Sequence, residues 1–94
     1  MADYLLVLCK LGRKIRISQS YWIKIVTLKH PVMVGKGKQV TKTLEDPVIV
    51  RKSKRDANVY LYYRPFGKRY ICVVVKQENG TGYIISFYPV DKIK

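Results

Sequence analysis

The chain has 94 residues, and 19 Lys and Arg against six Asp and Glu give a formal net charge of +13 at pH 7. A chain of this length is expected to form a single domain, residues 1–94, that buries roughly 60–65% of its unfolded surface. The hydrophobic fraction of 48% excludes a disordered polyelectrolyte. Such a charge favours polyanionic partners, with nucleic acid as the first candidate and an anionic membrane as the second.

The cysteine and hydropathy patterns favour a soluble, cytoplasmic protein without a membrane partner. Cys9 and Cys72 are the only cysteines, which excludes the disulfide framework of a small secreted peptide. The apolar run at residues 4–9 is short and follows an acidic residue, which is not typical of a signal peptide. No segment approaches the ~20 apolar residues that a membrane span requires.

The first third of the chain is predicted to form a short hairpin and then a helix. Residues 4–10 and 14–18 flank a Gly-Arg turn, and the second run alternates apolar and basic residues as a half-buried strand does. The helix is expected to begin at Ser18 or Ser20, because serine is a good N-cap. It should end near His30, because a following proline disfavours the α conformation.

A second helix and the main sheet are predicted in the rest of the chain. The helix is expected at residues 38–45. Strands are expected at residues 47–53, 58–64, 69–76 and 83–88, because runs rich in Tyr, Val and Ile alternate there with turn residues. The predicted fold class is α+β, with two N-terminal helices packed on one face of a four- to five-stranded antiparallel sheet.

The period-two rule divides these strands into an apolar face and a cationic, aromatic face. The predicted apolar face contains Val48, Val50, Val59, Leu61, Tyr63, Ile71, Val73 and Val75. The predicted opposite face contains Arg51, Ser53, Tyr60, Tyr62, Arg64 and Lys76. A solvated face would usually mix Thr, Glu and Lys, so we interpret the second face as a surface for single-stranded nucleic acid.

Several kinds of active site are excluded by the residues present. One histidine, two distant cysteines and six acids, of which only Glu45 and Asp46 are adjacent, show no metal-ligand spacing. We therefore predict no metal site and no cofactor. The glycines within residues 35–38 lack the spacing of a P-loop. Cys72 lies within an apolar run, which is typical of a buried thiol rather than a nucleophile.

Metal-independent cleavage of RNA is the chemistry that remains. The 2′-OH attacks the adjacent phosphorus, so the site needs only proton-transfer groups and cations. An imidazole, with an ordinary pKa near ~6.5, suits either proton transfer, and His30 is the only histidine. The cations that could bind phosphate are Arg51, Lys54, Arg55 and Arg64, and the hydroxyls predicted on the same face are those of Tyr62, Ser86 and Tyr88.

Each of these features also has a structural explanation. A histidine before a proline is often only a helix terminus, the basic run at residues 51–55 could be a solvated patch, and tyrosine-rich strands often form core and rim. Composition alone therefore supports a basic nucleic-acid-binding domain.

A series of short motifs adds a resemblance. In order, they are Trp22, Lys29-His30-Pro31, TLEDP at 43–47, RKSKRD at 51–56, LYYR at 61–64, CVVVK at 72–76, GYIIS at 82–86 and DKIK at 91–94. From about residue 6 to residue 94 the chain resembles small prokaryotic and phage domains that are classed with the barnase, colicin and RelE-like nuclease fold. The resemblance implies a sheet backed by two N-terminal helices, with an RNA-cleaving face.

The resemblance also implies site residues and a partner. The positions that match are His30, Arg51, Ser53, Arg55, Tyr62, Arg64, Lys76 and Ser86. Relatives of this kind often act as toxins that an acidic antitoxin protein restrains, and a charge of +13 would suit such a partner. We therefore expect a metal-independent endoribonuclease, a toxin of a toxin–antitoxin pair. The alternatives are a non-catalytic RNA- or DNA-binding module that uses the same face, and a subunit that only recruits an acidic protein.

Overall fold

The computed structural model describes residues 3–78 and 80–93 of the chain. Its first two strands, β1 (Asp3–Leu8) and β2 (Lys14–Ser18), form the predicted N-terminal hairpin. The turn between them contains Gly12 with a φ of 81°, a conformation that glycine adopts without steric cost.

A helix begins directly after this hairpin, as its sequence predicts. The first turns are α1 (Gln19–Lys24), and the Ser18 Oγ caps them by accepting a hydrogen bond from the Tyr21 N–H at 3.2 Å. The helix then widens into a π-helical segment, η1 (Ile25–Lys29). It ends at His30, whose N–H donates to the carbonyl five residues earlier at 2.9 Å.

A short 3₁₀ turn and a longer helix follow. The turn is η2 (Pro31–Met33), and the helix is α2 (Gly37–Glu45), with Val40 and Leu44 fully buried. Spaced four residues apart, these two side chains lie on one side of the helix and point into the core. Among the helices of the described residues, none is long and apolar enough to cross a membrane.

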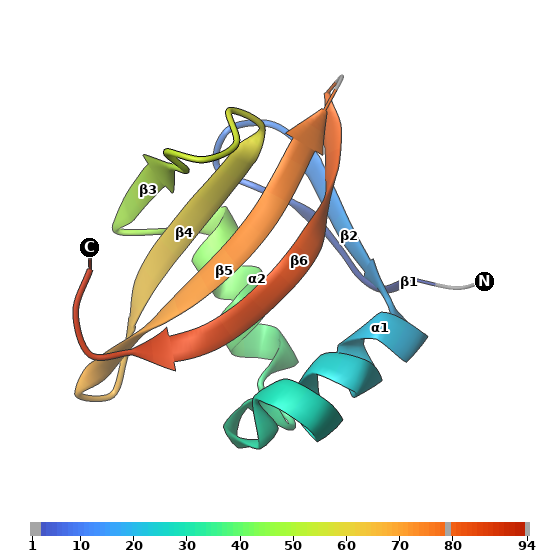
Figure 1. Cartoon of the computed structure of the whole chain (residues 1–94), viewed down its shortest axis with the longest axis vertical. Helices are drawn as coiled ribbons and strands as arrows, with labels where there is room; N and C mark the ends of the chain where they lie inside the picture. Colours follow the sequence, from blue (N-terminus) through green and yellow to red (C-terminus); the bar gives the residue numbers. More distant parts are fainter. Residues whose placement is uncertain (1–2, 79, 94) are drawn as a thin grey trace.

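Four more strands complete a single sheet. They are β3 (Ile49–Lys52), β4 (Val59–Phe66), β5 (Arg69–Glu78) and β6 (Thr81–Val90). The strand order is β1-β2-β6-β5-β4-β3 (Figure 1). All neighbouring strands are antiparallel except β2 and β6, which run parallel. This parallel contact joins the N-terminal hairpin to the C-terminal strands.

The predicted fold class is therefore wrong. We expected two N-terminal helices on a four- to five-stranded antiparallel sheet, as in RelE-like and barnase-like domains. The sheet instead has six strands, it is mixed, and two of its strands precede the helices. Apolar–polar alternation along a strand is the same for a parallel and an antiparallel neighbour, so the sequence pattern does not reveal the β2–β6 pair.

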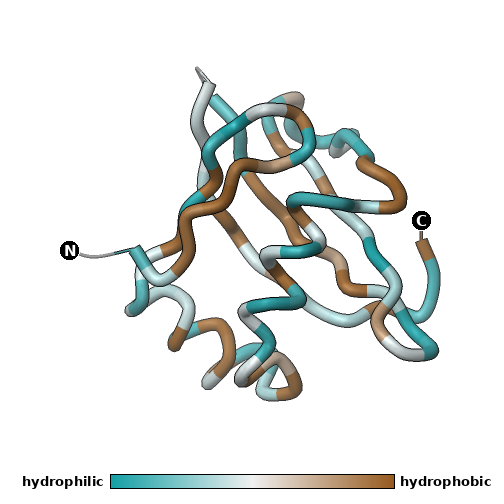
Figure 2. Tube along the Cα trace, turned by 180° about the vertical axis from the view of Figure 1, so that it is seen from behind, coloured by the Kyte–Doolittle hydropathy of each residue, from teal (hydrophilic) through white to brown (hydrophobic). Residues whose placement is uncertain are grey.

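The helical segments lie on one face of the sheet, which we call the covered face. Figure 1 looks onto the opposite, open face, with α2 behind the strands. Figure 2 shows the molecule from behind, where the helices cross in front of strands with hydrophobic stretches. Between the two layers lies the core, whose fully buried side chains include Ile15, Ile25, Met33, Val40, Leu44, Tyr62, Ile71, Val73, Val75, Ile84 and Phe87.

The register of the β4–β5 hairpin reverses our face prediction for β4. Tyr62 is opposite Val73, and opposite residues of paired strands share a face. Tyr62 therefore lies on the covered face, whereas Tyr63 lies on the open face. The hairpin closes at the Phe66–Arg69 pair with a two-residue loop, and any loop of even length pairs even positions with odd ones. Our prediction instead grouped odd positions of both strands, because it followed side-chain hydrophobicity.

Candidate nucleic-acid interface

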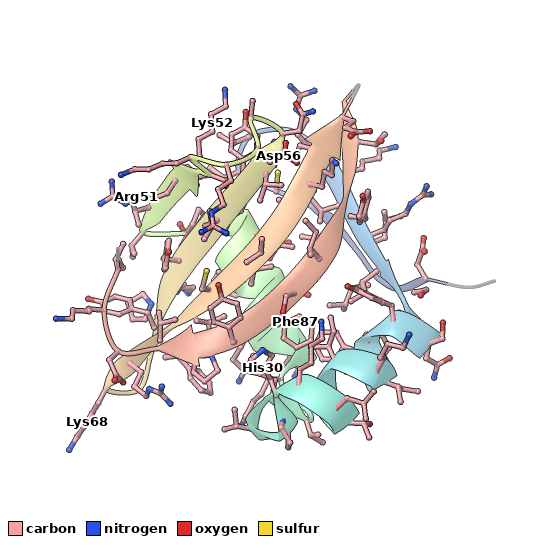
Figure 3. All side chains as sticks on the ribbon, in the orientation of Figure 1. His30, Arg51, Lys52, Asp56, Lys68 and Phe87 are labelled. Atoms are coloured by element: carbon pink, nitrogen blue, oxygen red, sulfur yellow. The ribbon has the colours of Figure 1, made fainter. Side chains whose placement is uncertain are left out.

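The open face contains a groove between the β3–β4 connection and the C-terminal end of β6. Its volume is about 490 Å³, and we call it the basic groove. The groove is lined by Arg51, Lys52, Ser53, Lys54, Arg55, Leu61, Tyr63, Tyr88, Val90 and Lys92. Figure 3, in the orientation of Figure 1, shows the Arg51 and Lys52 side chains extending from β3.

Apolar and aromatic side chains form the floor of the basic groove. Leu61 and Tyr63 come from β4, and Tyr88 and Val90 come from β6, each pair at alternate positions that share the open face. Between them, β5 contributes the buried Cys72, which is opposite both Tyr63 and Tyr88 in the register. The strand pairing therefore assembles this floor from three neighbouring strands.

Burial keeps the polar groups of the floor protonated. It is the main cause that raises the pKa of Tyr63 and of Tyr88 to about 12. Burial also raises the pKa of the Cys72 thiol, although the neighbouring Tyr63 and Tyr88 hydroxyls oppose this shift. At neutral pH both tyrosine hydroxyls are therefore protonated, and Cys72 is not a thiolate nucleophile.

The rim of the basic groove is strongly cationic. Its exposed cations are Arg51, Lys52, Lys54, Arg55 and Lys92. Ion pairs in the described part of the chain engage Arg64, Arg69 and Lys76, and none involves a rim cation. The positive charge of the rim is therefore available to an external anion.

Local hydrogen bonds order the loop that carries most of this charge. Ser53 Oγ accepts from the Arg55 N–H at 3.2 Å, and Asp56 Oδ1 accepts from the Asn58 N–H at 2.9 Å. Such side-chain-to-backbone bonds are typical of tight turns. The sequence folds this way locally because Ser and Asp each stand two residues before the N–H that they bind.

His30 lies beside the basic groove, at the edge of β6. Its ring centroid is 5.3 Å from that of Tyr88, and the two rings are tilted by 40°. Strand β2 pairs only with residues 81–83 of β6, so the helical corner that ends at His30 can approach the C-terminal part of β6. Figure 3 shows the half-buried His30 side chain below this strand. The only histidine thus contacts a tyrosine that lines the groove.

The predicted catalytic residues separate into two groups. His30, Arg51 and Ser86 lie on or beside the open face, where Ser86 is opposite Val74 of β5. Tyr62 is fully buried under the helices, which also raises its pKa. Our prediction for Tyr62 is therefore wrong, because a side chain enclosed in the core cannot contact a substrate.

Hydrogen bonds explain why Tyr62 is buried despite its hydroxyl. Its Oη donates to Gln77 Oε1 at 2.6 Å and lies 3.1 Å from Cys9 Sγ. Buried polar groups are stable when they are paired in this way.

The predicted RNA-binding residues also separate. Those that line the basic groove are Ser53, Lys54, Arg55 and Tyr88. Arg64 lies on the covered face, where its Nη1 donates to the Asp46 carbonyl oxygen at 2.6 Å and to Asp46 Oδ2 at 3.1 Å. Lys76 points to the open face outside the groove, and its Nζ lies 3.6 Å from Asp56 and 3.7 Å from Glu78. These two acids raise the pKa of Lys76 and partly neutralise its charge.

Sequence reasoning missed part of the groove. Leu61 and Tyr63 were predicted to lie in the core, and the even length of the β4–β5 loop is the signal that could have placed them on the open face. Lys92 belongs to the segment after β6 and reaches the groove only through the pairing of β6 with β5.

Comparison with protein-family models, with curated proteins and with solved structures finds no match to this chain. The chemistry of the basic groove is therefore the guide to function. Surfaces that bind single-stranded nucleic acid combine cations, which contact phosphates, with aromatic and apolar side chains, which contact bases. The rim and the floor of the basic groove have this combination.

Proposed function

We propose that this protein binds single-stranded RNA in the basic groove. The observation that carries this proposal is the position of five exposed rim cations around the floor of Tyr63 and Tyr88. The cations would neutralise successive phosphates, and the floor would take a base of the same strand. A duplex keeps its bases stacked inside, so it could use only the rim. The proposed location is the cytoplasm, where RNA is available to the protein.

Metal-independent cleavage of the bound RNA is a second proposal, favoured by the contact between His30 and Tyr88. His30 would accept the proton of the 2′-OH as its oxygen attacks phosphorus. Tyr88, which stays protonated at neutral pH, would donate a proton to the leaving 5′-oxygen. Arg51 would stabilise the charge that develops on the phosphoryl oxygens. The products would be a 2′,3′-cyclic phosphate end and a 5′-OH end.

The toxin role that the resemblance implies belongs to this second proposal. An acidic antitoxin would restrain the protein by covering the basic groove, because complementary charge directs such a contact. The antitoxin and RNA would then compete for one surface.

A salt titration tests the binding proposal. With the rim engaged, the logarithm of the association constant for a labelled single-stranded RNA should fall as log salt rises. The slope should be about 0.7 for each phosphate that the protein neutralises. The double variant Lys54→Gln/Arg55→Gln should lower this slope by about 1.4, which corresponds to two lost phosphate contacts. A matched control, Lys10→Gln/Lys24→Gln, removes the same charge from the β1–β2 turn and from α1. Equal losses for both double variants would contradict binding in the groove.

A chelator assay tests the cleavage proposal. RNA of defined sequence is incubated with the protein and EDTA, and the new ends are mapped chemically. We expect cleavage to persist and to leave 2′,3′-cyclic or 3′-phosphate ends. Intact binding without any cleavage would reject the second proposal and retain the first.

A further inference from the structure

A second basic pocket lies on the covered face, where α2 meets the end of β4. Its volume is about 320 Å³, and we call it the α2 pocket. It is lined by Lys38, Gln39, Lys42, Thr43, Arg64, Pro65 and Ile71. Arg64 directly follows the groove residue Tyr63 on β4 and points to the other face of the sheet. The sheet itself therefore separates the α2 pocket from the basic groove.

Three cations from two elements converge on the α2 pocket. Lys38 and Lys42 are four residues apart on α2, so they lie on the same side of the helix. Within the described residues neither lysine forms an ion pair, and like charges at this spacing repel each other. Arg64 is paired with Asp46, so three cations and one acid leave the cluster a net charge of +2. An anion between the lysines would relieve their repulsion.

The contacts of Arg64 leave one edge of its guanidinium available. Both of its hydrogen bonds to Asp46 come from Nη1, and no other bond of this side chain is found within the described residues. A guanidinium has five N–H donors in a planar fork, so the Nε–Nη2 edge can still bind two oxygens of one anion. Asp46 thus orients the arginine without occupying that edge.

The rest of the α2 pocket is less polar. Pro65 is exposed and forms an apolar wall, behind which Ile71 is fully buried. The Thr43 hydroxyl is already used, because it donates to the Gln39 carbonyl oxygen at 2.7 Å. The pocket therefore offers cations for an anionic group and an apolar wall for whatever that group is attached to.

We propose that the α2 pocket binds a phosphate monoester attached to a nucleoside. A phosphate monoester carries a charge of about −1.5 to −2 at neutral pH, which matches the cluster of +2 better than a carboxylate or a phosphodiester does. Its oxygens suit the free edge of Arg64, and the apolar wall suits a ribose or base. The monoester could belong to a free mononucleotide or to the end of an RNA strand.

Chemical-shift titration of isotopically labelled protein tests this proposal with five probes: inorganic phosphate, adenosine monophosphate, adenosine, a short RNA with a 5′-phosphate, and the same RNA without it. We expect adenosine monophosphate to shift the amides of residues 38–43, 64 and 71. Adenosine should not shift them, and inorganic phosphate should bind more weakly than the nucleotide. The proposal is overturned by equal binding of adenosine and its monophosphate, or by shifts confined to the basic groove.

Variants separate the α2 pocket from the groove. Lys42→Gln should weaken adenosine monophosphate binding about tenfold, because a charge-assisted contact is lost. The exposed position of Lys42 should leave the melting temperature unchanged. Lys54→Gln/Arg55→Gln should leave nucleotide binding intact, even if RNA binding in the groove fails altogether. Unchanged nucleotide affinity in Lys42→Gln would overturn the proposal.

The RNA probe identifies the source of the phosphate. If a 5′-phosphate on the RNA is required for shifts in the α2 pocket, the ligand is an RNA end. If the mononucleotide shifts the amide resonances of the α2 pocket and the phosphorylated RNA does not, the ligand is a free nucleotide.

Discussion

Tyr62 and Tyr63 are neighbours in the sequence and lie on opposite faces of the sheet. Tyr62 is fully buried under the helices and donates a 2.6 Å hydrogen bond to Gln77 Oε1. Tyr63 lines the floor of the basic groove. One tyrosine therefore contributes to core stability and the next to the binding surface, so substitutions in this region can separate stability from function.

Tyr62→Phe should lower the free energy of unfolding by about 1–3 kcal/mol, because Gln77 Oε1 loses its 2.6 Å hydrogen bond and keeps only the 3.9 Å bond from Cys9 Sγ. Affinity for RNA should be unchanged under conditions where the variant is folded. Denaturant unfolding and fluorescence anisotropy measure the two quantities. Tyr83→Phe is the control, because Tyr83 is 49% exposed. The loss of its hydroxyl should change the free energy of unfolding by less than about 0.5 kcal/mol. A Tyr62→Phe protein of parental stability that fails to bind RNA would contradict this assignment.

Stability should fall in alkaline solution. Burial raises the pKa of Tyr63 and Tyr88 from 10.0 to about 12, so the folded state favours their protonated forms. The resulting stability is fully present below the pKa of the unfolded chain and is lost as the pH rises from 10 to about 12. Urea unfolding at a series of pH values measures the decline. The decline should be shallower in Tyr88→Phe, and an identical pH dependence in that variant would argue against this account.

Gly82→Ala should destabilise the junction between β2, β6 and β5. A Cβ at Gly82 would lie 2.5 Å from the Lys76 carbonyl oxygen and 2.8 Å from the Ile15 Cδ1, so backbone or side chains must move. We expect a loss of about 1–3 kcal/mol, as for other overpacked core sites. Gly37→Ala is the control: its Cβ would come no closer than 3.4 Å to the Tyr4 Oη, and alanine favours a helix by up to about 1 kcal/mol.

Melting temperatures compare the two glycine variants. A Gly82→Ala protein that melts at the parental temperature would mean that the parallel junction is looser than the structure shows.

His30→Ala should lower the single-turnover rate of RNA cleavage by about 10²–10⁴-fold, which is the usual contribution of a general acid or base. RNA affinity and melting temperature should remain near the parental values, because His30 is half-buried at the edge of the sheet. Arg51→Ala should reduce both rate and affinity, since the bound phosphate is charged before and during reaction. Cleavage at the parental rate by a folded His30→Ala protein would reject His30, and Ser86 would be the next candidate.

A His30→Ala protein that loses rate and thermal stability together would instead identify His30 as a structural helix end. Lys29→Ala is the neighbouring control, because Lys29 is exposed at the end of η1. Its rate, affinity and melting temperature should all stay close to the parental values.

Local structure was largely determined by the sequence alone. The Ser18 cap, the end of the first helix before Pro31, and the β2 strand from residue 14 to residue 18 follow from interactions between residues close in the chain. The faces of β4 could also have been predicted from the sequence. The even length of the hairpin loop determines which residues of β4 and β5 share a face. Hydrophobicity predicted the opposite assignment for β4, because Leu61 and Tyr63 line a groove floor that is itself apolar.

Only the tertiary structure decided how distant segments meet. The parallel pairing of β2 with β6 brings Ile15 beside Gly82, and strand periodicity carries no information about that neighbour. The same pairing ends at residue 83 of β6, so β2 does not cover the later part of β6, where His30 contacts Tyr88. Candidate cations and the lone histidine could be found in the sequence because their chemistry is local. Their grouping into a groove could not, because side chains far apart in the chain converge only when the sheet is assembled.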